Sequence, residues 1–223
     1  MSEVATDYIS ERRLEEKDRR RSQILDAAES VAATSGIESL TMEQVARRAR
    51  LSRALIYLYF KDKLDLHFGL CERGIALLTQ RFEEAHRRPM QGLAKIIAIG
   101  RAYVAFSQEF PVYFDALARF QAQEAELPQS PGATAAGSLT ACLAASARLH
   151  EIIASVIAEG QRDGTISPAA GDPLAVSLTL WGFMHGIIQL STTKAALLGE
   201  LGLDTRALQE QALKLATRAL APA

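Results

Sequence analysis

The sequence predicts an all-α protein with a small three-helix N-terminal domain, a linking helix and a larger C-terminal helical domain. Three observations predict this fold. Apolar residues recur at helical spacing along most of the 223 residues. The prolines and most glycines fall between these periodic segments. No stretch shows the alternation of β-branched and polar residues, bounded by turns, that strands require.

Composition narrows the class further. With 48% apolar residues and a net charge of −1, the chain can form one or two ordinary soluble domains with a sizeable core. Cys71 and Cys142 are too isolated for a disulfide framework or a metal site, so we expect two buried thiols. We count no apolar run of about eighteen residues and no signal peptide, and therefore expect a cytoplasmic protein without membrane contact.

The N-terminal segment 1–15 has mixed charge and little apolar content, so we expect it to be frayed or disordered. The first helix follows, with an apolar stripe at Ile24, Ala28 and Val31, and ends at Gly36. A start near Ser10 would place Glu11 in its first turn, where acids are favourable.

A second and a third helix are predicted between Thr41 and Lys63. Thr41 is an N-cap for a helix that begins at Met42, and Gln44 completes a capping box. Val45, Ala46 and Ala49 form its inward stripe.

Ser52 is the next N-cap, for a helix over Arg53 to Phe60 with Ile56 and Phe60 facing inward and Leu51 filling the turn. The remaining circumference bears one cation and two phenols. Two short helices of this kind, joined by a tight turn, are typical of a helix-turn-helix whose second helix enters the major groove of DNA.

Charge supports that interpretation. Residues 41–63 contain six cations and two acids, a net charge of +4 in a nearly neutral chain, and cations that meet phosphates supply much of the affinity for DNA. An ordinary solvated basic corner is the alternative. Arg19, Arg20 and Arg21 are likewise either the solvated first turn of a helix or an arm that contacts DNA.

At these residues the chain resembles the tetracycline-repressor (TetR) family of bacterial transcription regulators. The matching features are Ile24, Ala27, Ala28, Gly36, Thr41, Val45, Ala46, the Leu51-Ser52 pair, and above all the string IYLYFKDK from Ile56 to Lys63. Arg50 is a departure, because the family usually has Gly at that position of the turn. A left-handed conformation there would cost a non-glycine residue roughly 1 to 2 kcal/mol.

The resemblance and the charge together imply a DNA-binding domain over residues 16–66. The expected DNA-binding residues are Thr41, Arg50, Ser52, Arg53, Ala54, Leu55, Tyr57, Leu58, Tyr59, Lys61 and Lys63. Residues 67–223 would form a C-terminal domain for ligand binding and dimerisation.

Asp62 is the N-cap of a linking helix that we expect to run to about His86. Five further helices are predicted at about Met90 to Glu109, Val112 to Ala125, Ser138 to Arg162, Pro173 to Thr193 and Asp204 to Leu220, with a loop over Glu126 to Gly137.

The helix from Pro173 is apolar on nearly its whole circumference, so all its sides must be covered. Gly182 and Gly186, four residues apart, suggest a tight backbone crossing, which could lie in the core of one subunit. The resemblance implies instead a twofold homodimer paired through the last two helices. The expected interface residues are Trp181, Gly182, Gly186, Leu208 and Leu215.

Aromatic residues gather in the middle of the second domain, and the resemblance implies an effector site there, although such residues can equally be core. The candidates are Tyr103, Phe106, Phe110, Tyr113, Phe114, Phe120, His150, Trp181, Met184 and His185. No phosphate loop, carboxylate pair or nucleophile motif is present, so we expect no enzyme activity, cofactor or metal.

These observations predict a repressor that binds a near-palindromic operator in double-stranded DNA as a homodimer and is released by a small apolar or amphipathic effector. The alternative is a helical small-molecule carrier or enzyme-associated module whose basic corner is incidental.

Overall fold

The structure is a computed structural model that describes residues 2–124 and 137–222, with side chains over 11–120 and 137–222. The described residues form α-helices and one short 3-10 turn, Pro168–Ala170, and contain no strand. The predicted all-α class is confirmed.

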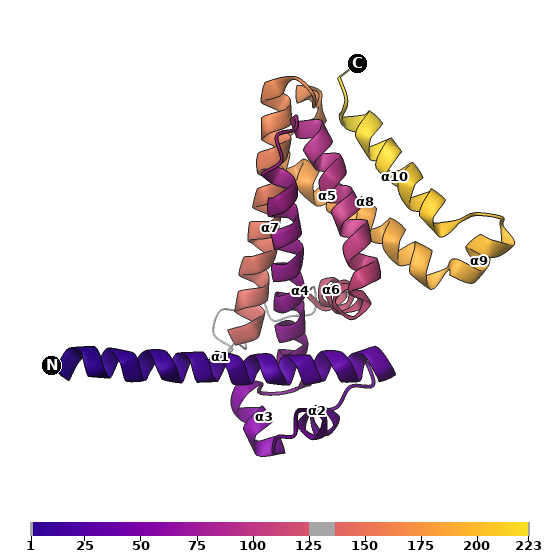
Figure 1. Ribbon diagram of the computed structural model, residues 1–223. Coiled ribbons are helices and arrows are strands. Elements are labelled where there is room, and N and C mark those ends of the chain that lie inside the picture. The colour runs from indigo at the N-terminus through magenta and orange to yellow at the C-terminus, as the bar shows by residue number, and fades with distance from the viewer. Residues whose placement is uncertain (1, 125–136, 223) are drawn as a thin grey trace.

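Helix α1 (Ser2–Ser35) lies across one end of the molecule, with α2 (Met42–Ala49) and α3 (Arg53–Tyr59) beneath it. From there α4 (Lys63–His86) rises into the second domain beside α7 (Figure 1). The second domain contains α5 (Gly92–Glu109), α6 (Pro111–Glu124), α7 (Gly137–Asp163), α8 (Pro173–Thr193), α9 (Ala195–Glu200) and α10 (Thr205–Leu220).

Helix α1 begins at Ser2, so the structure has helix where we expected a frayed or disordered segment over residues 1–15. Within it, Glu16 pairs with Arg19 at 2.6 Å and with Arg20 at 3.0 Å. Such pairs three and four residues apart favour a helix, and no glycine or proline interrupts the chain before Gly36. Gly36 ends the helix with φ of 78°, as predicted.

The predicted caps of the first domain are confirmed. Thr41 and Gln44 form the capping box of α2, and the Ser52 hydroxyl accepts from the backbone N–H of Leu55 at 3.2 Å. Helix α3 ends one residue early, at Tyr59, but Phe60 is fully buried as expected.

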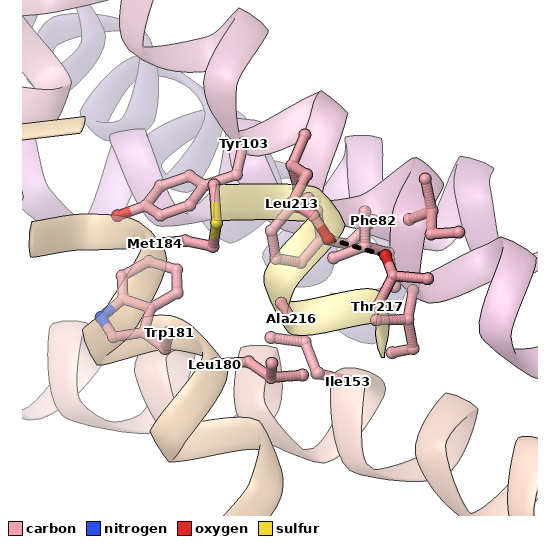
Figure 2. Close-up of a pocket in the computed structure, with 13 residues that line it drawn as sticks. Phe82, Tyr103, Ile153, Leu180, Trp181, Met184, Leu213, Ala216 and Thr217 are labelled. Atoms are coloured by element: carbon pink, nitrogen blue, oxygen red, sulfur yellow. Dashed lines mark hydrogen bonds between the residues drawn. The ribbon is translucent and has the colours of Figure 1, made fainter. Parts of the chain in front are cut away.

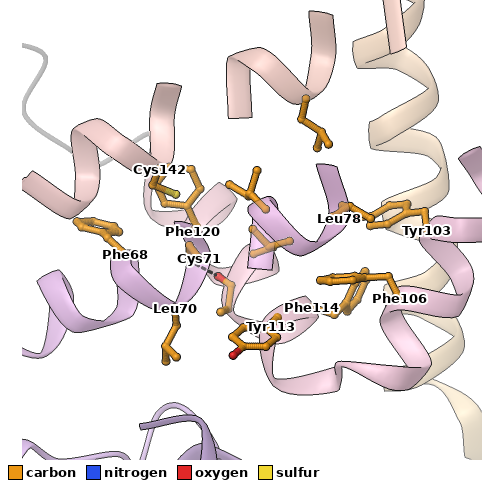
Figure 3. Close-up of a cluster of buried hydrophobic side chains, with 14 of the residues drawn as sticks. Phe68, Leu70, Cys71, Leu78, Tyr103, Phe106, Tyr113, Phe114, Phe120 and Cys142 are labelled. Carbon is orange, nitrogen blue, oxygen red and sulfur yellow. Dashed lines mark hydrogen bonds between the residues drawn. The ribbon is translucent and has the colours of Figure 1, made fainter. Parts of the chain in front are cut away.

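Helix α4 is the central element of the fold. Asp62 caps it, its side chain accepting from the backbone N–H of Asp65 at 2.8 Å. Its buried residues continue from Leu66 near α1 to Phe82 among the helices of the second domain. Figure 3 shows the cluster of apolar side chains around its middle, where α4 meets α6 and α7. Both cysteines are free and buried there, as expected.

In the second domain the five predicted helices occur in the predicted order, with ends shifted by at most two residues. Most of the expected loop over Glu126 to Gly137 lies outside the described residues. The short helix α9 was not predicted, since its six residues are too few to show helical periodicity. Helices α5 and α7 cross closely: a Cβ added to Gly92 would lie 2.2 Å from the Cα of Gly160.

Helices α7 and α8 are long and apolar enough to cross a membrane, judged by length and composition. This corrects our expectation that no segment reaches that length, which counted only uninterrupted apolar runs. One third of the apolar window of each helix is buried in the structure. Helix α7 packs against α4, α5 and α8, and α8 packs against α7 and α10.

Candidate nucleic-acid interface and helical-domain cavity

Helix α3 presents most of its surface to solvent. Ile56 is fully buried and anchors the helix, while Leu58 is 80% exposed and Tyr57 43% exposed. The Arg53 guanidinium donates to the Tyr57 hydroxyl at 3.5 Å and lies 5.9 Å from the centre of its ring. The cation and the phenol, one turn apart, therefore form a single exposed unit.

The structure exposes nine of the eleven residues expected to bind DNA and leaves Leu55 and Tyr59 half-buried. The hydroxyls of Thr41 and Ser52 already serve as helix caps. The exposed residues are Thr41, Arg50, Ser52, Arg53, Ala54, Tyr57, Leu58, Lys61 and Lys63.

The turn between α2 and α3 is a Schellman motif. Leu51 N–H donates to the Ala46 carbonyl at 2.9 Å, and Arg50 N–H donates to the Arg47 carbonyl at 3.2 Å. Arg50 has φ of 55° and ψ of 43°, the left-handed conformation that glycine favours. The turn therefore places Arg50 in a position that glycine would occupy without strain, and the backbone of Arg50 is strained there.

Two residues that were not singled out from the sequence hold α2 in place. Gln23 donates to the Ala49 carbonyl at 2.9 Å, and Arg48 donates to the Ser30 hydroxyl at 2.9 Å. Both contacts join α2 to α1. No local pattern announces them, because the partners lie eighteen or more residues apart.

The second domain contains a small apolar cavity of about 50 Å³ between α4, α5, α7, α8 and α10 (Figure 2). Phe82 of the linking helix forms part of its wall. Of the ten effector candidates, three line this cavity: Tyr103, Trp181 and Met184. The lining is otherwise aliphatic, apart from Thr217, whose hydroxyl donates to the Leu213 carbonyl at 2.7 Å.

A buried polar pair lies behind that wall. The Tyr103 hydroxyl lies 2.6 Å from Nδ1 of His185, and the Trp181 ring stacks on Tyr103 with centroids 4.5 Å apart. Burial lowers the pKa of His185 to about 4 and raises the pKa of Tyr103. The imidazole is therefore neutral near pH 7, and Tyr103 donates to it.

The other candidates do not line the cavity. His185 is hydrogen-bonded to Tyr103, which lines the cavity. Nδ1 of His150 lies 3.1 Å from the Ser177 hydroxyl. Phe106, Phe114 and Phe120 are core residues, Phe110 lies under Arg81, and Tyr113 donates to Glu29 of α1 at 2.6 Å. Aromatic composition could not distinguish these roles, because packing partners far along the chain decide them.

The exposed side of helix α8 includes a stripe of residues spaced four apart: Leu174, Leu178, Gly182, Gly186 and Leu190. A Cβ added to Gly182 or Gly186 would meet nothing within 4 Å, so the expected tight crossing does not occur among the residues that the structure describes. Beside the stripe, an apolar groove of about 420 Å³ between α8 and α10 includes Phe183 and Leu215.

Two of the five expected interface residues are in this stripe, and Leu215 lies in the groove and is 50% exposed. Leu208 is half-buried on α10. Trp181 is half-buried and turned toward Tyr103 and the cavity, and its place in the interface stays a prediction.

Among proteins of known function, the chain is similar to a transcriptional activator, FasR, of Mycolicibacterium smegmatis, with 28% identity over 44% of this chain and 47% of the relative. It is also similar to the fatty acid metabolism regulator protein of Bacillus subtilis, with 36% identity over 28% of this chain and 32% of the relative. The chain thus spans less than half the length of these curated relatives.

Solved structures share the fold over nearly the whole chain. A protein of unknown function from Rhodococcus sp. RHA1 superposes with a TM-score of 0.70 at 24% identity, covering 91% of this chain and 95% of that one. The fatty acid degradation regulator FadR of Bacillus halodurans superposes with a TM-score of 0.65 at 17% identity, covering 89% and 94%.

Two family profiles match the chain directly. The one described as bacterial regulatory proteins, tetR family, matches residues 24–68, which contain α2, α3 and most of the buried part of α1. The one described as tetracyclin repressor-like, C-terminal domain, matches residues 96–216, more than half of the chain. The chain therefore belongs to the TetR family of helix-turn-helix transcription regulators.

Proposed function

We propose that this chain is a repressor that binds a near-palindromic operator as a homodimer in the cytoplasm and is released by a small apolar or amphipathic effector. The observation that supports it best is the exposed face of α3, where Arg53 and Tyr57 stand on a helix anchored by Ile56. A short, capped and rigidly anchored helix with an exposed cation fits the major groove.

Within this proposal the eleven residues have different roles. Arg53, at the first position of α3, reads base edges, since arginine pairs bidentately with guanine. Tyr57 and Lys63 contact phosphates, which orient the domain without reading sequence. Thr41 and Ser52 first cap their helices and can also bind phosphate. Ala54, Leu55, Leu58, Tyr59, Arg50 and Lys61 complete the surface, with residues 16–66 as the DNA-binding domain.

The homodimer forms through α8 and α10 of residues 67–223. The apolar stripe of α8 is exposed, and its two glycines allow close approach of a second helix. Twofold pairing would present two copies of α3 to half-sites about 34 to 36 Å apart.

The cavity beside Tyr103 is the proposed effector site. At about 50 Å³ it is much smaller than the 300 to 1,000 Å³ typical of ligand sites, so an effector must widen it. Two similar proteins are named for fatty acid metabolism or degradation, and the aliphatic lining fits an effector with a hydrocarbon chain.

Widening the cavity would move the linking helix. Phe82 lies in the cavity wall near one end of α4, and Lys63 is in its first turn at the other end. The 24 residues of α4 span about 36 Å at 1.5 Å per residue. A small tilt at Phe82 therefore displaces the DNA-binding domain by several ångströms, more than the fixed spacing of half-sites tolerates.

The DNA-binding proposal is tested by selecting operators from a random pool of duplexes and measuring affinity against salt. We expect a near-palindromic sequence, one dimer per duplex and affinity that falls steeply with salt. Lys63→Ala should weaken selected and random duplexes alike and lower the salt slope by about one unit. A carrier with an incidental basic corner would select no sequence.

The effector proposal is tested by linkage. An effector that releases the operator must bind the DNA-bound dimer more weakly by the same factor. Compounds with hydrocarbon chains that raise the melting temperature of the protein would be titrated with and without saturating operator. Equal affinities in the two titrations would show that the compound does not act through α4.

A further inference from the structure

A second cavity lies where the two domains meet, and it shares no lining residue with the one beside Tyr103. Its volume is about 350 Å³, within the range of about 300 to 1,000 Å³ typical of small-molecule sites. The connection between α1 and α2, the first turns of α4 and one residue of α6 form its walls.

The interior of this junction cavity is apolar apart from the buried His67, and its rim carries two cations. Ile37, Leu40, Leu66 and Leu70 form the apolar part and are each at most 6% exposed. Lys63 from α4 and Arg119 from α6 lie at the rim.

Both cations contact the same residue, Glu38. The Arg119 guanidinium pairs with the Glu38 carboxylate, and the Lys63 ammonium donates to the Glu38 backbone carbonyl. The Glu38 side chain is 75% exposed, so its ion pair is screened by water and easily replaced. Arg119 also pairs with Asp115 of α6 through Nε at 3.2 Å, so the two cations at the rim are balanced by two acids.

We propose that the junction cavity binds a small amphipathic anion, a monocarboxylate with a short hydrocarbon chain. The chain of this ligand lies on the apolar interior, where burial of each methylene is favourable. Its carboxylate replaces that of Glu38 on Arg119 and lies within reach of Lys63. A neutral ligand cannot take the place of the Glu38 carboxylate on Arg119, so the charge-assisted contact with the guanidinium favours the anion.

Occupancy of the junction cavity has a consequence that rests on the proposed DNA-binding function. In that proposed function Lys63 contacts a DNA phosphate. An anion in the junction cavity would hold the Lys63 ammonium at the cavity instead. The ligand and DNA would then compete for one side chain. Binding of the anion itself requires no DNA, so it can be tested independently of that function.

The test is calorimetric titration of the full chain with octanoate, and with 1-octanol as the uncharged match. We expect octanoate to bind about tenfold more tightly than 1-octanol, because a hydrogen bond to a charged group contributes roughly that factor. Arg119→Ala should weaken octanoate binding about tenfold and leave 1-octanol unchanged. Glu38→Ala should instead tighten octanoate binding, since it removes the carboxylate that competes with octanoate for Arg119.

Two control variants complete the design. Arg101→Ala removes one exposed arginine of α5 and should change nothing, which separates a local contact from a change in net charge. Met184→Trp fills the cavity beside Tyr103 and should leave octanoate binding intact. Melting curves verify that each variant is folded.

The proposal is overturned if octanoate does not bind, or if Arg119→Ala and Glu38→Ala leave its affinity unchanged. It is equally overturned if Met184→Trp abolishes binding, which would place octanoate in the cavity beside Tyr103. None of these outcomes bears on whether the protein binds an operator, since no DNA is present in the titration.

Discussion

The exposed faces of α3 and α8 differ in chemistry, although neither is covered by another described part of the chain. The α3 face has a cation and a phenol in contact, Arg53 and Tyr57. The α8 face is an uncharged stripe in which Leu178 is 52% exposed beside two glycines. Contacts to phosphate weaken with salt, whereas burial of apolar surface does not. The two faces are therefore suited to different partners, DNA for α3 and a second copy of the chain for α8.

The glycines of the second domain also fall into two kinds, which differ in what occupies the position of the missing side chain. At Gly92 the backbone of Gly160 occupies the place that a side chain would need. At Gly182 and Gly186 that place is open. A helix interior loses about 1 kcal/mol per glycine relative to alanine, so glycines at an open surface call for a partner outside the chain.

The largest effect is expected from a charge on the α8 stripe. Leu178→Asp should dissociate the dimer with a loss of about 4 kcal/mol, because the twofold axis would bury two unpaired carboxylates. Sedimentation equilibrium measures the dissociation. The monomer should keep its melting temperature, since Leu178 is half exposed. A dimer that survives this change would place the interface elsewhere.

The next effect concerns the inner crossing. Gly92→Ala should lower the free energy of unfolding by about 3 kcal/mol, because the new methyl group meets backbone that cannot move aside. Gly182→Ala is the matched control and should leave the monomer unchanged or slightly more stable. Denaturant unfolding of both variants measures the difference. Similar changes in the free energy of unfolding for the two variants would contradict the contrast between Gly92, where backbone occupies the Cβ position, and Gly182, where that position is open.

On the α3 face, Arg53→Ala should cost about 1 to 3 kcal/mol of affinity for the selected operator and little for random duplex. The reason is that a base contact is lost while the phosphate contacts remain. Fluorescence anisotropy with both duplexes gives the two values. Equal losses would show that Arg53 contacts the backbone and reads no bases.

The smallest effect is expected in the turn beneath that face. Arg50→Gly should stabilise the protein by roughly 1 kcal/mol, since glycine adopts the left-handed conformation without strain. If the guanidinium also reaches a phosphate, the same change weakens DNA binding. Thermal melts and anisotropy measure the two effects separately, and an unchanged melting temperature would argue against strain at Arg50.

Much of the fold could be predicted because its helix ends are determined locally. Thr41, Ser52, Asp62, Asp172 and Asp204 each cap a helix through a hydrogen bond to a backbone N–H two or three residues away. Such caps are visible in the sequence, since both partners are neighbours in the chain. The same holds for Gly36, while Arg50 could only be suspected of a left-handed conformation from its position in the turn.

The candidate sites were predictable to different degrees. The residues predicted to bind DNA lie close together in the sequence, and the exposure of those on α3 follows from the period of one anchored helix. The cavity residues come from five helices, and aromatic composition selected core residues such as Phe106 and Phe120 along with Tyr103. Nothing in the sequence indicates that Phe82 of the linking helix lines the same cavity.

The sequence by itself determined where the helices lie, how they are capped and which short segment is cationic, because these properties depend on residues a few positions apart. Only the tertiary structure decided which aromatic residues enclose a cavity and at which glycines backbone from another helix occupies the place of a side chain. It also decided that Lys63 and Arg119 both contact Glu38. Those arrangements depend on residues far apart in the chain, and Glu38 and Arg119, for example, are 81 positions apart. Packing of whole helices, to which each residue contributes little on its own, brings them together.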